Sequence, residues 1–178
     1  MLRHSTFGMA LFINILIICL WHFISYIISG NIKPQRVDYK QKPYKISKLE
    51  QKGNFYIENF FIDKWYMLLP TSYNSVGIDV ESVKSIDTLT LKSYLTLTCR
   101  SELFSRINFL YIICACVLDA PYLAFILGIF VILINLPFFA SSRYCRCIIL
   151  NELLSRRNEL NKKDNSISVF DIIYSNPR

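Results

Sequence analysis

The residues able to do chemistry in this 178-residue chain are six cysteines, two histidines and a small number of carboxylates. Two cysteine pairs have a spacing that suggests a metal site, namely Cys114-x-Cys116 and Cys145-x-Cys147. In a helix, however, residues two positions apart point to nearly opposite sides, so neither pair can chelate from one face. We therefore predict no metal site and no disulfide framework, with cysteines in apolar stretches acting as small apolar residues.

The histidines give no support to catalysis, because His4 lies near the terminus and His22 lies within an apolar stretch. Ser-His-Asp and Cys-His arrangements then have no suitable base, and the chain contains neither a glycine-rich phosphate loop nor an H-E-x-x-H motif. Asp119 is the first suspect for ion or proton handling, because it is the carboxylate that stands in an apolar stretch. Its place beside Pro121 favours a turn instead. We predict no catalytic residue, no cofactor and no enzymatic activity.

The element that must carry His22 is a charge-free apolar run over residues 7–29, preceded by a short tail at 1–6. At about 1.5 Å per residue, the run is long enough to cross a hydrocarbon core of about 30 Å. Its length and its exit sequence favour an uncleaved transmembrane helix over a signal peptide. Asn14, His22 and Ser25 fall near one another on a helical wheel, which makes them helix-packing candidates.

A second apolar block, residues 107–140, is too long for one crossing and short for two. Asp119 and Pro121 supply a break, since proline removes a backbone donor and aspartate suits a cap or turn. We predict a helical membrane hairpin over 101–140 with its tip near 119–121. A single span preceded by a surface or partner-bound helix remains the alternative.

The hairpin would place Asn108 and Asn135 toward the same bilayer face, where they could hydrogen-bond between its arms. Arg106, Arg143 and Arg146 flank the apolar block and are predicted to contact lipid headgroups. With a hairpin, the central region and the C-terminal tail lie on one side of the membrane. A single second span would separate them.

The formal charge of +7 does not by itself indicate nucleic acid, because the basic residues flank the apolar segments. Such clusters are what the positive-inside rule describes. We predict the lipid bilayer and other membrane protein subunits as partners, and no nucleic acid. The predicted location is a membrane, either the inner membrane of a cell or that of an organelle, crossed more than once.

The central region, residues 30–100, shows period-two runs rich in aromatic and β-branched residues, which predict about four short strands. Residues 141–163 are predicted to form an amphipathic basic helix on the membrane surface or against a partner, with a continuation of the preceding span as the alternative. A polar tail follows at 164–178. The predicted fold class is a membrane protein with α-helical spans and a small β-rich (α+β) extramembrane region.

The leading functional prediction is a non-enzymatic accessory or scaffolding subunit of a larger membrane complex. It depends on the polar stripe in the first span, the broken hairpin and the missing catalytic groups. A membrane immunity or sensor protein is the first alternative. A small transporter or ion-conducting oligomer is the second, and it would depend on Asp119 and the intramembrane asparagines.

Overall fold

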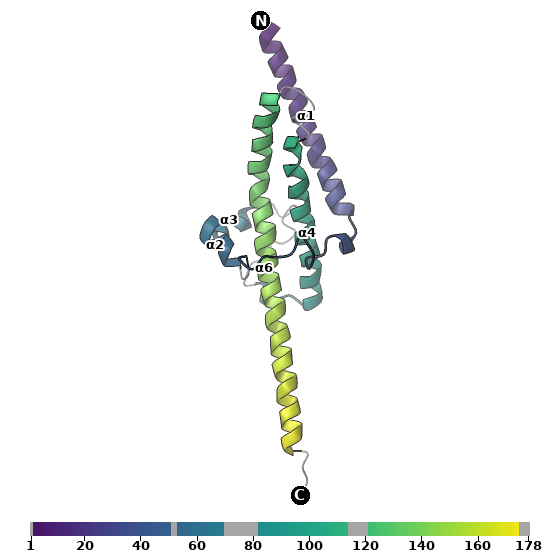
Figure 1. The fold of residues 1–178 in the computed structure, drawn as a ribbon, viewed down its shortest axis with the longest axis vertical. Coiled ribbons are helices and arrows are strands. Elements are labelled where there is room, and N and C mark those ends of the chain that lie inside the picture. The colour runs from purple at the N-terminus through teal and green to yellow at the C-terminus, as the bar shows by residue number, and fades with distance from the viewer. Residues whose placement is uncertain (1, 51–52, 70–81, 114–120, 175–178) are drawn as a thin grey trace.

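Three long helices lie side by side and form the body of the molecule (Figure 1). The computed structural model describes residues 2–50, 53–69, 82–113 and 121–174. The long helices are α1 (Leu2–Asn31), α4 (Thr88–Phe109) and α6 (Pro121–Tyr174). The short ones are η1 (Pro34–Arg36), α2 (Asn54–Phe60), α3 (Ile62–Trp65), η3 (Tyr66–Leu68) and η4 (Ser82–Ser85).

Helices α4 and α6 run antiparallel and share the most extensive helix contact of the described chain, while α1 packs on α4. Helix α6 also passes close to Ile112, which follows α4 in the chain, because an added Cβ at Gly128 would lie 2.7 Å from Cγ1 of Ile112. Trp21 ties α1 to α4 by donating from its indole nitrogen to the Ile107 carbonyl at 3.0 Å. In Figure 1 the N-terminus lies near the end of the α4–α6 pair at which α6 begins.

The predicted β-rich region is wrong, because the described residues of 30–100 contain helices and turns but no strand. The aromatic run 54–69 forms α2, α3 and η3. The alternating leucines from Leu89 to Leu97 lie in α4. The alternation at 76–81 lies outside the described residues. Aromatic and β-branched content is a weak signal when a tertiary helix contact decides the local structure.

Helical spacing explains why α4 forms. Its carboxylate cap is Asp87, whose side chain accepts from the Thr90 backbone N–H at 2.9 Å and so satisfies one free donor of the first turn. Leu91, Leu95 and Glu102 then fall on one side of the helix and are each fully buried. The period of this buried stripe is that of a helix, although the intervening leucines and threonines also alternate in sequence.

The segment before α4 wraps the middle of α6. Gly53 has a φ of +80° at the start of α2, and a Cβ there would lie 3.1 Å from the Tyr144 ring on α6. Glycine suits both the left-handed backbone and the close approach. The rings of Tyr56 and Tyr66 pack edge-on against Tyr144, with centroid distances of 6.5 and 5.4 Å. This aromatic contact fixes α2 and η3 on α6.

Helix α6 continues without a break through residues 141–163, which is the alternative to a separate surface helix. Pro121 is its first residue, and Asp119 of the predicted tip lies outside the described residues. Residues Phe7–Asn31 and Phe125–Asn161 are each helical, long and apolar enough to cross a membrane. The exposed side chains of α1 and of residues 125–136 are mostly isoleucine, leucine and phenylalanine, as contact with lipid requires, whereas residues 155–161 expose mostly polar side chains. The chain is a membrane protein.

Candidate active site

A dense group of charged side chains lies buried where α4 and α6 meet the segment that precedes α2. We call it the arginine–glutamate cluster. Its members are Glu50, Tyr56, Glu102, Arg106, Arg143 and Arg146.

Glu102 on α4 is the centre of this cluster and is fully buried. Its Oε1 accepts from Arg143 at 2.9 Å and from Arg106 at 2.6 Å, and its Oε2 accepts from Arg146 at 2.5 Å. One carboxylate therefore neutralises parts of three guanidinium groups. Without it, Arg146 would be a buried guanidinium with no carboxylate partner among the described residues.

Glu50 supplies the second carboxylate. Nε and Nη2 of Arg143 each donate to it at 2.7 Å, in the two-pronged geometry that guanidinium and carboxylate groups share. The Tyr56 hydroxyl donates to the same carboxylate. Burial alone would raise the pKa of Glu50, but the hydrogen bonds from Arg143, Tyr56 and Ser47 outweigh burial and lower this pKa to about 2. Burial and the Glu50 charge hold the pKa of the Tyr56 hydroxyl above its usual value.

Arg146 is held by groups from two segments, α4 and the chain that precedes α2. Besides Glu102, it donates to the Tyr44 carbonyl at 2.7 Å and to the Thr98 hydroxyl at 3.1 Å. Its Nη2 is buried and has no hydrogen-bond partner among the described residues. Three arginines against two glutamates leave the cluster with a net positive charge.

Helical spacing positions these side chains. Arg143 and Arg146 are three residues apart on α6, and Glu102 and Arg106 are four apart on α4, so each pair shares a face. Beside them Ser142 donates to Ser101 at 2.7 Å, a contact that small side chains permit between close helices.

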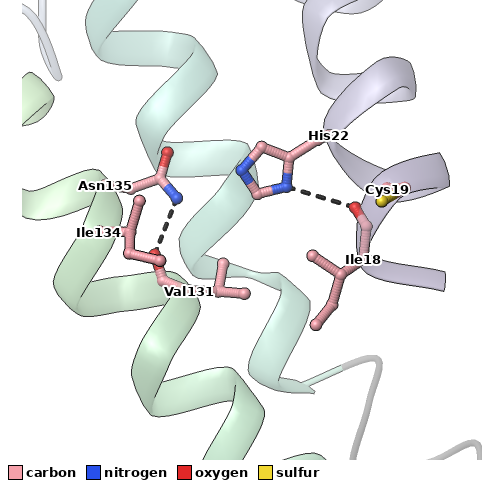
Figure 2. Close-up of a pocket in the computed structure, with 6 residues that line it drawn as sticks. All are labelled: Ile18, Cys19, His22, Val131, Ile134 and Asn135. Atoms are coloured by element: carbon pink, nitrogen blue, oxygen red, sulfur yellow. Dashed lines mark hydrogen bonds between the residues drawn. The ribbon is translucent and has the colours of Figure 1, made fainter. Parts of the chain in front are cut away.

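A second feature is a groove of about 390 Å³ between α1 and α6. We call it the α1–α6 groove. It is lined by Ile18, Cys19, His22, Val131, Ile134 and Asn135 (Figure 2). The His22 ring packs edge-on against Phe104 of α4, with the ring centroids 5.9 Å apart. The groove is therefore apolar apart from one imidazole and one amide.

The structure separates the predicted helix-packing residues into two kinds. Asn14 and Ser25 bond to carbonyls of their own helix, at 2.9 and 2.7 Å. Asn108 donates to Asn135 at 3.2 Å, between α4 and α6, and His22 faces Asn135 across the α1–α6 groove (Figure 2). Three of the five predicted residues are thus brought to one place.

The arginines predicted to contact headgroups lie in the arginine–glutamate cluster. Arg143 and Arg146 are 7% and 0% exposed and pair with glutamates, so the structure places them inside the protein. The Arg106 side chain is 36% exposed and lies over the Phe139 ring. Headgroup contact stays a prediction for Arg106.

Sequence reasoning missed Glu50, Tyr56 and Glu102. Glu102 carried a usable signal, because it precedes Arg106 by one helical turn and follows the buried positions of Leu91 and Leu95 at helical spacing. Glu50 carried none, since its partner Arg143 is 93 residues away in the chain.

Comparison with known proteins identifies the family. The sequence model of the CrtO family, glycosyl-4,4'-diaponeurosporenoate acyltransferase, matches residues 40–155. The chain belongs to this family. No curated protein and no solved structure matches it. The match encloses the whole arginine–glutamate cluster, together with Asn108 and Asn135, whereas α1 lies before it.

The family corrects two functional predictions. The prediction of a non-enzymatic protein is wrong, because the chain belongs to a family of acyltransferases. The predicted scaffolding role has no support. Both predictions relied on the lack of motifs known from water-soluble enzymes, and a site assembled from isolated polar residues on several apolar helices leaves no such motif in the sequence.

Proposed function

We propose that the chain is an integral membrane acyltransferase, which transfers an acyl group from an activated donor to a hydroxyl of a glycosylated, lipid-soluble acceptor. The observation that carries the proposal is the family match over residues 40–155, which contains every residue of the arginine–glutamate cluster. The family description names both the acyl transfer and a glycosylated acceptor.

The position of the arginine–glutamate cluster supports this proposal. Arg100 beside it donates to the Ile32 carbonyl, just beyond the end of α1, at 2.9 Å. The cluster therefore lies level with the end of the first apolar helix, where a lipid-soluble acceptor and a water-soluble donor can meet. Its net positive charge suits an anionic donor, and guanidinium groups bind phosphate groups well. Arg106, at the exposed edge, is the member such a donor can reach.

The proposed membrane arrangement has α1 and the α4–α6 pair inserted together. The described central region and the extension of α6 would then lie on one side, with the N-terminus toward the other (Figure 1). Lipid contact follows from the exposed apolar side chains of α1 and of the first half of α6. In this arrangement the arginine–glutamate cluster lies on the side of the membrane from which the water-soluble acyl donor arrives.

Activity of the full chain in vesicles tests the proposal. Glycosyl-4,4'-diaponeurosporenoate is incorporated into the bilayer, acyl thioesters of several chain lengths are added, and acylated product is followed by mass spectrometry. We expect product from the wild type. Absence of product with every donor, from protein that shows a cooperative unfolding transition, would overturn the proposal.

The variant Arg106→Gln examines the donor contact. We expect it to raise KM for the thioester about tenfold or more, because a charge-assisted contact is lost. Arg156→Gln is the matched control, since Arg156 lies on the extension of α6 and pairs with Glu152 at 2.8 Å. The control should leave KM within about twofold of the wild type.

A further inference from the structure

The α1–α6 groove contains a histidine with one unused ring nitrogen. Nδ1 of His22 lies 3.3 Å from the Ile18 carbonyl, which can only accept, so Nδ1 carries the hydrogen. In the neutral ring Nε2 is then a free acceptor. No hydrogen bond reaches Nε2 within the part of the chain that the structure describes, and the ring points across the groove toward Asn135 (Figure 2).

A second unused acceptor belongs to Asn108, which is hydrogen-bonded to the groove residue Asn135. Asn108 donates to Asn135 through its amide nitrogen, but its own Oδ1 is buried with no partner among the described residues. Asn135 uses its nitrogen for the Val131 carbonyl at 2.8 Å. In an apolar region, each unsatisfied acceptor costs about 1–3 kcal/mol unless a ligand supplies a donor. Hydroxyl groups are such donors.

Helix packing alone does not account for this arrangement. Asn14 and Ser25 lie near His22 on the wheel of α1, and each donates a hydrogen bond to a carbonyl of its own helix. Neither residue lines the α1–α6 groove. His22 differs from them, because its second nitrogen faces a groove of about 390 Å³, which is within the range of small-ligand sites.

We infer that the α1–α6 groove receives the hydroxyl-bearing part of the acceptor and that His22 is the general base of the transfer. This inference rests on the proposed function and adds a catalytic residue from α1, outside the matched region. It names the class of acceptor as an alcohol on an apolar molecule, which the apolar lining accommodates.

The chemical step balances with an acyl thioester as donor. Nε2 takes the hydroxyl proton as the oxygen attacks the thioester carbonyl carbon. The new carbon–oxygen bond forms and the carbon–sulfur bond breaks. The leaving thiolate takes the proton from the imidazolium, which restores neutral His22 and gives an ester and a thiol.

The rate of acyl transfer by His22→Gln tests the assignment. A positioned base contributes about 10²–10⁴-fold, so we expect a loss of at least about 100-fold in kcat. Ser25→Ala on the same helix is the control and should stay within about twofold of the wild type. His22→Ala with added imidazole should recover part of the lost rate, a result that a purely structural histidine would not give.

A variant on α6 keeps the inference falsifiable where the histidine variants fail to fold. Ile134 is 60% exposed and lines the α1–α6 groove, so Ile134→Trp fills the groove while remaining apolar. We expect at least a tenfold rise in KM for the acceptor, with KM for the thioester unchanged.

The outcomes separate the two proposals. A wild type that makes product, with His22→Gln at full rate or Ile134→Trp at unchanged acceptor KM, overturns the base and the groove but leaves the acyltransferase. A folded wild type that makes no product overturns both.

Discussion

The arginine–glutamate cluster and the α1–α6 groove lie about two turns apart on α6, yet they use polar groups in opposite ways. In the cluster, nearly every charged atom has a partner, and the partners come from three separate segments. In the groove, Nε2 of His22 has no hydrogen-bond partner in the described structure, and Asn108, which bonds the groove residue Asn135, keeps one acceptor unused. Asn135 donates to the Val131 carbonyl and accepts from the Asn108 amide.

The difference separates groups that hold the fold from groups that can act on a ligand. A fully bonded buried network is rigid, and its removal leaves charges that neither lipid nor protein can solvate. A polar side chain that keeps one hydrogen-bonding atom without a partner adds little to stability. That atom is available to bind a substrate. We therefore expect cluster variants to change unfolding and groove variants to change turnover.

The largest expected effect is that of Glu102→Gln. Loss of this charge leaves Arg143 and Arg146 with one carboxylate between them, and breaking a buried pair costs about 3–5 kcal/mol. Denaturant unfolding in detergent measures it. Glu152→Gln is the control, because its pair with Arg156 is a partly exposed i,i+4 pair worth at most about 1 kcal/mol. Equal effects of the two variants would refute a structural role for the cluster.

The next effect is a dependence of stability on acid that comes from Glu50. Its pKa is lowered from an unfolded value near 4.5 to about 2, so the folded state is favoured above pH 4.5 and loses that advantage as pH falls toward 2. The expected loss is on the order of 2–3 kcal/mol. Unfolding midpoints measured from pH 5 to 2 should fall less steeply in Glu50→Gln than in the wild type. Parallel curves would contradict the lowered pKa.

The sequence predicted an apolar helix over 7–29, where the structure has α1, because the signal for such a helix is local. A charge-free run as long as 7–29 crosses a bilayer whatever the rest of the chain does. The sequence could not predict the helix in the central region, because Leu91 and Leu95 were interpreted from their nearest neighbours rather than from the helix they pack against. A buried stripe with a period near four and an alternating pattern coexist in these residues, and the contact with α6 decides between them.

The cluster was beyond prediction for a different reason. Arg143 and Arg146 follow an apolar span, and the ordinary fate of such arginines is to reach the headgroups. Only the positions of Glu50 and Glu102 in space turn them inward. The bond between Asn108 and Asn135 was easier to predict. It joins two antiparallel helices, and counting residues along each helix is enough to place the two asparagines at a similar depth in the membrane.

A smaller effect is expected where α6 passes close to Ile112, which follows α4 in the chain. In Gly128→Ala the new Cβ would lie 2.7 Å from Ile112, and relief of such overpacking costs about 1–3 kcal/mol. Gly8→Ala on α1 is the control, since nothing lies within 4 Å of its Cβ position. The control should equal or exceed the wild type in stability, because alanine favours helices more than glycine. If Gly128→Ala were as stable as Gly8→Ala, Ile112 would lie farther from α6 than the structure places it.

The smallest effect on stability is that of Asn135→Ala. This variant also distinguishes most clearly between the roles of the arginine–glutamate cluster and the α1–α6 groove. Interhelical hydrogen bonds in membranes average about 0.6 kcal/mol and reach about 1.7 kcal/mol, so the midpoint of unfolding should move little. The transfer rate should fall at least tenfold, because Asn135 lines the α1–α6 groove opposite His22. Asn14→Ala is the control, because Asn14 bonds to a carbonyl of its own helix. It should leave the midpoint of unfolding close to that of the wild type and the transfer rate within about twofold. An Asn135→Ala protein that loses stability but keeps its rate would place Asn135 with the arginine–glutamate cluster, as a group that holds the helices rather than one that meets the substrate.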